Sequence, residues 1–184
     1  MKTRFLLAAV ACLGLSACNT GSGPSFAHGP ARNPKLAALG WKENTKPFAL
    51  GILDTTVAHA LVCQNEKCGG PAAYMVGDGT VSDTGFGHIV AAIESASPSQ
   101  TDAVIADIQR GSLRQNTQGV NVESVKKLGK EVVIVANAPT TLPNGQSGVA
   151  VLHLTFEGGH MRLEAGAAAS HAAAASLFRL AASV

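Results

Sequence analysis

Apolar residues recur at helical spacing near the middle of the chain, at Val104, Ile105 and Ile108. This stripe, flanked by charged positions, predicts an amphipathic helix over residues 98–110. Ser97 is a preferred cap, Pro98 suits the first helical position, and Gln100 completes a capping box with Ser97. Gly111 is placed to end the helix. We expect the apolar stripe to face a core.

After this helix the pattern changes, and β-branched and apolar residues alternate or cluster between turns. The segments concerned are 119–125, 131–136, 148–156 and 161–165. The turns that separate them contain Gly or Asn, which tolerate positive φ angles. The pattern therefore predicts a meander of four antiparallel strands.

The other segments are predicted with less definition. Residues 167–183 are rich in Ala, with Leu177 and Leu180 three apart, which predicts an amphipathic helix that packs on the sheet. Residues 48–53 and 72–77 have the composition of strands. Residues 54–62 and 88–95 are compatible with either strand or helix.

This order of elements predicts an α+β domain, an antiparallel β-sheet packed with helices. Together with the Phe178, Ala182 and Ser183 pattern of the last helix, the order over residues 46–184 is similar to the PsbP/Mog1-like α/β/α sandwich. That resemblance implies an accessory or binding protein without catalytic residues. The competing prediction is a β-sandwich, the fold of some secreted invasion-associated proteins with a cysteine pair.

The start of the chain has the features of an export signal. Met1 to Arg4 form a short basic region, and residues 5–15 form an apolar run about half as long as the ~20 residues that a transmembrane helix needs. The four residues that follow, Leu15-Ser16-Ala17-Cys18, resemble the lipobox of bacterial lipoproteins. The resemblance implies cleavage before Cys18, a lipid on its sulfur and acylation of its new amino group.

Processing at that site changes the composition that matters for function. Lys2 and Arg4 leave with residues 1–17, so the 14 basic residues become 12 and balance the 12 acidic ones. No basic excess then remains to indicate nucleic-acid binding. Because position 19 is Asn rather than Asp, the lipoprotein resemblance implies the periplasmic face of the outer membrane more than the inner membrane.

Two cysteines, Cys63 and Cys68, remain for the mature domain. They flank a polar loop that is closed by turn residues, and an exported chain meets an oxidising compartment, so we predict a disulfide. Adding His59 gives an H-x3-C-x4-C set that is still short of the ligands a metal needs. The spacing also differs from the C-x-x-C of redox sites.

The domain organisation follows from these features. Residues 18–40 are rich in Gly, Pro, Ser and Asn, which predicts a lipidated flexible tether. Residues 41–184 are enough for a single globular domain with one core.

No motif for catalysis, a metal or a cofactor emerges. There is no G-x-S-x-G nucleophile elbow and no H-E-x-x-H zinc motif, and the stretch from Asp78 to Asp83 lacks the later Glu of a calcium loop. His153 and His160 could approach each other across a hairpin, but two histidines alone make a weak site. We therefore predict no catalytic, metal or cofactor residues.

A partner surface is instead predicted on the polar, glycine-rich loop that we expect over residues 69–88, because binding residues concentrate on loops. Its candidate contacts are Tyr74, Met75, Asp78, Phe86 and His88.

Three functions remain open. The first is a lipid-anchored envelope protein that binds the membrane through its lipid and has a binding or accessory role, with an envelope protein or a small apolar ligand as partner. The second is a periplasmic hydrolase that uses His153 or His59 with a nearby acid. The third is a purely structural envelope protein.

Overall fold

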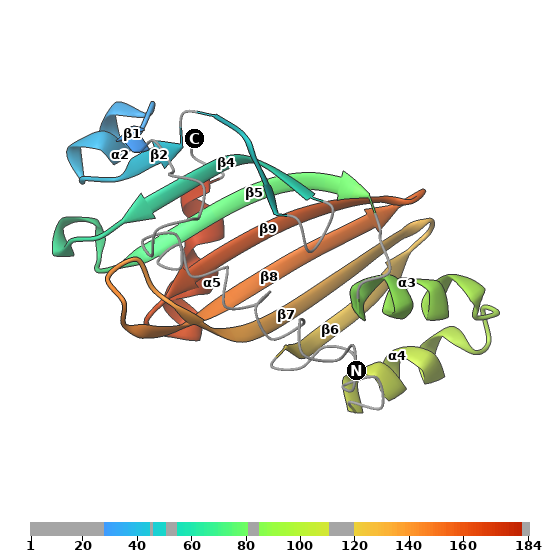
Figure 1. The fold of residues 1–184 in the computed structure, drawn as a ribbon. Coiled ribbons are helices and arrows are strands. Elements are labelled where there is room, and N and C mark those ends of the chain that lie inside the picture. Colours follow the sequence, from blue (N-terminus) through green and yellow to red (C-terminus); the bar gives the residue numbers. More distant parts are fainter. Residues whose placement is uncertain (1–27, 45, 51–54, 81–84, 111–119, 182–184) are drawn as a thin grey trace, which may run out of the picture.

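The computed structural model describes residues 28–44, 46–50, 55–80, 85–110 and 120–181 (Figure 1). A nine-stranded antiparallel sheet forms the centre of the molecule, in the order β1-β2-β4-β5-β9-β8-β7-β6, with β3 also pairing with β4. The strands are β1 His28–Pro30, β2 Lys42–Asn44, β3 Phe48–Leu50, β4 Thr55–Cys63, β5 Ala72–Thr80, β6 Asn121–Leu128, β7 Glu131–Thr141, β8 Ser147–Glu157 and β9 His160–Ala168. The helices are α2 Pro34–Ala38, α3 Gly85–Ser95, α4 Thr101–Arg110 and α5 His171–Ala181, with a short 3₁₀ helix, η2, at Glu66–Cys68.

The predicted α+β class is confirmed, and the alternative β-sandwich is wrong. Strand β9 ends the predicted meander and pairs with β5 over its whole length, from Ala73 with Ala167 to Thr80 with His160. This pairing joins the strands from both halves of the chain into one sheet instead of two.

The four strands of the meander form where the alternating pattern predicts them. Strands β7, β8 and β9 extend beyond their predicted ranges, whereas β6 is shifted, from the predicted 119–125 to Asn121–Leu128. The turns between the strands contain Gly129 and Gly145 at φ 66° and 85°. Gly tolerates this left-handed conformation because it has no β-carbon.

The sheet buries apolar side chains on both faces. Met75 belongs to a core cluster that includes Ile89 and Ile93 of α3 and Ile108 of α4. The adjacent Tyr74 belongs to a second cluster with Leu36 of α2 and Leu177 of α5. Because neighbouring strand residues point to opposite faces, one face packs against α3 and α4 and the other against α2 and α5.

Helix α5 lies close to the sheet because small residues meet there. A β-carbon on Gly166 of β9 would lie 2.5 Å from the carbonyl oxygen of Ala174, a distance too short for any side chain. The absence of a side chain at Gly166 therefore sets the approach of α5. The helix begins later than predicted, because β9 continues to Ala168 and uses residues that we expected in the helix.

The capped helix is confirmed with a shorter span. Its first residue is Thr101, after a turn in which the backbone N–H of Ser97 donates to Oε1 of Gln100 at 3.2 Å. Gly111 lies outside the described residues. Of the two ambiguous segments, the described part of 54–62, from residue 55 on, lies in strand β4, and 88–95 lies in helix α3.

The predicted tether is wrong for residues 28–40. These residues form β1 and α2, and Leu36 is buried at 3% exposure, as is Trp41, which follows them. A glycine- and proline-rich composition hid the few apolar residues that anchor this segment. Residues 18–27 lie outside the described ranges. Among the helices that the structure describes, none is long and apolar enough to span a membrane.

Candidate functional site

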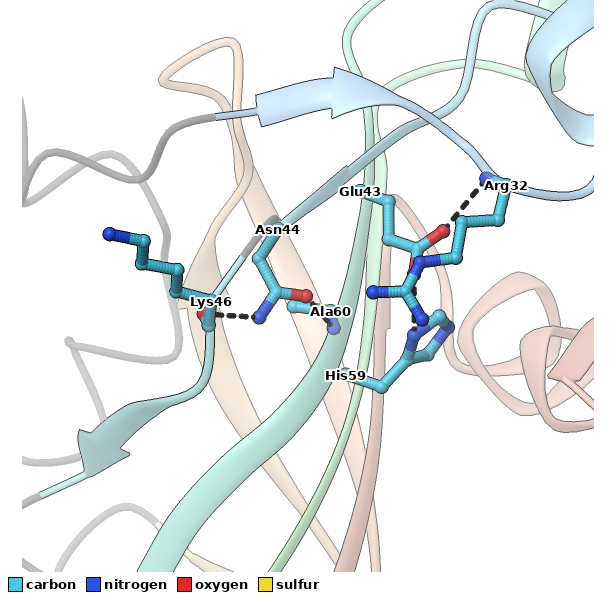
Figure 2. Close-up of polar contacts among 6 residues, drawn as sticks. All are labelled: Arg32, Glu43, Asn44, Lys46, His59 and Ala60. Atoms are coloured by element: carbon cyan, nitrogen blue, oxygen red, sulfur yellow. Dashed lines mark hydrogen bonds and ion pairs between the residues drawn. The ribbon is translucent and has the colours of Figure 1, made fainter.

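A buried carboxylate, Glu43 of β2, lies at the centre of a polar cluster near the edge of the sheet. Figure 2 shows its carboxylate between Arg32 and His59. Oε2 accepts the backbone N–H of Arg32 at 2.9 Å, and Oε1 lies 3.4 Å from Nε of Arg32 and 3.1 Å from Nδ1 of His59. The Glu43 side chain is 4% exposed, so these three contacts replace its hydration.

The cluster forms where strand β4 changes partners. Strand β2 pairs with β4 at Leu61 and Val62, whereas β3 pairs with it at Thr55 to Val57. A bulge between Val57 and His59 shifts the register against β5. A bulge re-aims the side chains beside it, and here it lies next to the histidine that meets Glu43.

Asn44 fills the gap between these two partner strands. Its Oδ1 accepts the buried backbone N–H of Ala60 at 2.6 Å, and its Nδ2 donates to the carbonyl oxygen of Lys46 at 2.8 Å (Figure 2). An unpaired buried N–H costs about 1–3 kcal/mol. The Asn44 side chain therefore pairs a backbone N–H of β4 that has no partner strand at this point.

The chemistry open to this cluster is that of a positioned histidine. A buried carboxylate at Nδ1 orients an imidazole, which is the supporting half of a general-base pair. Within the described ranges no hydrogen bond joins a Ser, Thr or Cys side chain to His59. The described part of the cluster therefore pairs a histidine with an acid and adds no nucleophile to them.

A second polar feature is a shallow recess of about 750 Å³ on the face that carries α5. Its lining residues come from paired positions on three strands, Asp78 with Arg162 and Thr155, and Thr80 with His160 and Glu157. Arg162 donates from Nε and Nη2 to Oε1 of Glu164 at 3.1 and 3.0 Å. This hydrogen bonding raises the pKa of Arg162 above its usual value.

An aromatic group lies where α5 packs on β5 and β8, two of the strands that line this recess. The ring of Phe178 stacks on His153 at 4.1 Å and meets Tyr74 edge-on at 6.0 Å. Burial, followed by the charge of Glu164, raises the pKa of Tyr74 to about 12. The neutral phenol is therefore the stable form in the fold.

The predicted disulfide is present between Cys63 and Cys68, whose Cα atoms are 6.2 Å apart. Cys63 is the last residue of β4 and is fully buried, and the loop continues through η2. His59, which was considered with the two cysteines as a metal ligand, contacts Glu43 instead. The described part of the chain contains no group of three or more residues that could hold a metal ion.

The predicted partner surface is wrong for two of its five residues. Residues 72–80 form β5, which confirms the strand predicted over 72–77 and contradicts a loop along that stretch of 69–88. Tyr74 and Met75 are each 3% exposed in opposite core clusters. Asp78 is exposed on β5, and His88 is exposed on α3. Phe86 falls within α3, and Cys18 lies outside the described residues.

The two histidines considered as a pair do not meet. His160 pairs with Glu157 at the end of the β8–β9 hairpin, whereas His153 pairs with Glu164 farther along the same strands. Sequence reasoning also missed Glu43, Arg32 and Asn44, since they fall in or beside the predicted tether. A single acid in a glycine- and proline-rich stretch carries no signal that it will be buried.

Comparison with known proteins adds no relative. No protein-family model, no curated protein and no solved structure matches the chain.

Proposed function

We propose that this chain is a bacterial lipoprotein anchored through Cys18, with a domain that has a binding or accessory role in the cell envelope. The sequence from Leu15 to Cys18 supports the anchor, and Asn19 favours the outer membrane. The likeness to PsbP/Mog1-like α/β/α sandwiches belongs to the same proposal, and the helices on both faces of the sheet support it.

The observation that carries the binding role is the polar recess beside α5. A sheet face that a helix covers at one end, and that presents Asp78, Thr155 and Arg162 at the other, offers polar contacts to a partner. The fold leaves these side chains at the surface. Polar groups converging in a concave site are typical of recognition surfaces.

The anchor is tested by fractionating cells that express the Cys18→Ala variant. Because two or three acyl chains hold a protein on a bilayer almost permanently, we expect the wild type in the membrane fraction and the variant in the soluble envelope fraction. Equal membrane association of both proteins would contradict lipidation at Cys18.

The binding role is tested by crosslinking in the envelope, comparing the wild type with Arg162→Glu. We expect specific crosslinks that the variant loses, because the change reverses the charge at the centre of the recess. Thr141→Glu is a matched control, since it adds one acid at an exposed position at the far end of β7, where Thr141 pairs with Ser147. Crosslinks that persist in Arg162→Glu would place the partner elsewhere.

A hydrolase is the second candidate, and the contact between His59 and Glu43 favours it. If His59 is a general base, His59→Gln removes most of the turnover in a screen of ester and amide substrates, about 100-fold or more. Unchanged activity in His59→Gln, or no turnover by the wild type, would exclude this role for His59.

A further inference from the structure

The basic residues of the first part of the mature chain gather at one border of the sheet. Lysine and arginine outnumber aspartate and glutamate by five to three between residues 19 and 67, and are outnumbered by seven to nine after residue 67. We name these five residues the basic edge: Arg32, Lys35, Lys42, Lys46 and Lys67.

The fold brings the basic edge together from separate elements. Lys35 lies in α2, Lys42 in β2, and Lys67 in η2 of the disulfide loop. The disulfide loop and the α2 segment touch, because a β-carbon on Gly40 would lie 2.7 Å from Nδ2 of Asn65. Figure 1 shows α2, β1 and β2 at the same border of the sheet.

The lysines of this edge have charges that the protein does not neutralise. All four are exposed and form no ion pair within the described residues. Of the described acids nearby, Glu43 is buried and occupied by Arg32 and His59, which leaves Glu66 exposed. The edge therefore carries a net positive charge at its surface.

An exposed apolar side chain lies within the same edge. Leu39, the C-cap of α2, is 44% exposed, although Leu36 of the same helix is buried. An exposed leucine on a segment that also carries lysines is the composition of segments that dock on a membrane surface, where the leucine enters the interface and the lysines meet headgroups.

The basic edge lies close to Cys18 along the chain. His28, the first residue of β1, is ten residues after Cys18, and an extended chain spans at most ~3.6 Å per residue, or about 36 Å here. If Cys18 carries lipid, the basic edge is therefore the part of the fold that the chain holds nearest to the bilayer.

We infer that the basic edge docks on the anionic phospholipid surface of the membrane that holds the lipid anchor. The proposed lipidation places this edge at the membrane, so the inference rests on the proposed function. Lipid and lysines then act as two membrane signals, and their joint action fixes the orientation of the domain, with the polar recess of β5, β8 and β9 left accessible.

A second lysine group offers a matched control. Lys126, Lys127 and Lys130 flank Leu128, which is 59% exposed, at the β6–β7 turn on the opposite border of the sheet. Both groups thus have lysines beside an exposed leucine. The two groups differ in position and in surroundings. In the second group Lys127 donates to the Ile93 carbonyl, and Glu131 adjoins Lys130. We therefore expect only the basic edge to bind the membrane surface.

The test uses the mature chain from residue 18 with Cys18→Ala, so that no lipid contributes. Its partition is measured by sedimentation with vesicles of phosphatidylcholine alone, and of phosphatidylcholine with 30% phosphatidylglycerol. Each lysine near an anionic surface contributes about fivefold in partition. We expect binding to the anionic vesicles that weakens about 100-fold in Lys35→Gln/Lys42→Gln/Lys67→Gln and changes less than threefold in Lys126→Gln/Lys127→Gln/Lys130→Gln.

A further variant and a stability measurement complete the test. Leu39→Ser reduces partition several-fold with every charge retained, and equal thermal midpoints show that the variants are folded. Equal losses in the two triple variants, or no preference for anionic vesicles, would overturn the inference. Loss of an envelope crosslink without loss of vesicle binding would replace the lipid surface with a protein partner. None of these outcomes depends on Cys18 being lipidated, which the fractionation experiment tests separately.

Discussion

The two borders of the sheet are held in different ways. At the β6 border a hairpin pairs β6 with β7 at seven positions, from Asn121 with Asn137 to Leu128 with Glu131, with one register shift between Val122 and Ser124. At the N-terminal border β2 pairs with β4 at two positions, and side chains complete the attachment through Glu43, Asn44 and the packing of Trp41. The β6 border depends mainly on backbone pairing, to which Glu123 and Lys127 add side-chain contacts. The N-terminal border has fewer paired positions and depends more on particular side chains.

These two kinds of attachment determine where a single substitution lowers the free energy of unfolding. Backbone pairing tolerates side-chain changes on exposed positions, whereas a border held by two polar side chains and a disulfide loop loses stability when one of them is removed. We therefore expect the N-terminal border to be sensitive and the β6 border to be tolerant.

The largest effect is expected from the disulfide. Closing a loop of about six residues stabilises a fold by about 2 kcal/mol in the chain-entropy model, and the loop also supports Gly40. Cys63→Ala/Cys68→Ala should lower the free energy of unfolding by about that amount in a urea titration. A change of less than about 0.5 kcal/mol, the size of a typical surface substitution, would mean that the loop does not support this border.

Asn44→Ala should have the next largest effect. It leaves the buried N–H of Ala60 without an acceptor and should cost about 1.5 kcal/mol. Asn121→Ala is the matched control at the other border, because Asn121 is exposed at the first position of β6. Similar costs for both variants would contradict the proposed difference between the borders.

Glu43→Gln should cost less, about 1 kcal/mol, because the amide oxygen can still accept the N–H of Arg32 while the charge that faces Arg32 and His59 is lost. Glu131→Gln at the β6–β7 turn is the control and should be nearly neutral. Urea titrations of the two variants measure this. A neutral Glu43→Gln would show that the charge adds nothing to the attachment.

The smallest effect is spectroscopic. Tyr74 is the sole tyrosine, and it packs in the cluster that includes Trp41, so its ultraviolet titration reports on the packing of this border. Its pKa is about 12 in the fold, against 10.0 for an ordinary phenol. The stabilisation associated with this shift is present below about pH 10 and is lost as the pH rises through about 12. A titration midpoint near 10 in the folded protein would show that Tyr74 is hydrated.

The same division explains how much the sequence could predict. The meander and the capped helix follow from alternation, from turn glycines such as Gly129 and Gly145, and from Ser97 with Gln100. These signals are local. The pairing of β5 with β9, which makes one sheet, joins residues far apart in the chain and leaves no local pattern.

The candidate sites were harder to predict for the same reason. The disulfide followed from two cysteines in one short loop, whereas Glu43 and His59 meet across two strands, at a bulge that no residue type marks. Tyr74 and Met75 were taken as surface residues because glycine flanks them on both sides. Their burial depends on the neighbouring strands β4 and β9.

The proposed lipid anchor at Cys18 lies ten residues before the first described strand. The mass of the N-terminal peptide, from the protein purified from membranes, tests this anchor. We expect a peptide that begins at Cys18 and carries the added mass of a diacylglyceryl group, with or without a further acyl chain. A peptide that begins elsewhere, or an unmodified Cys18, would contradict it.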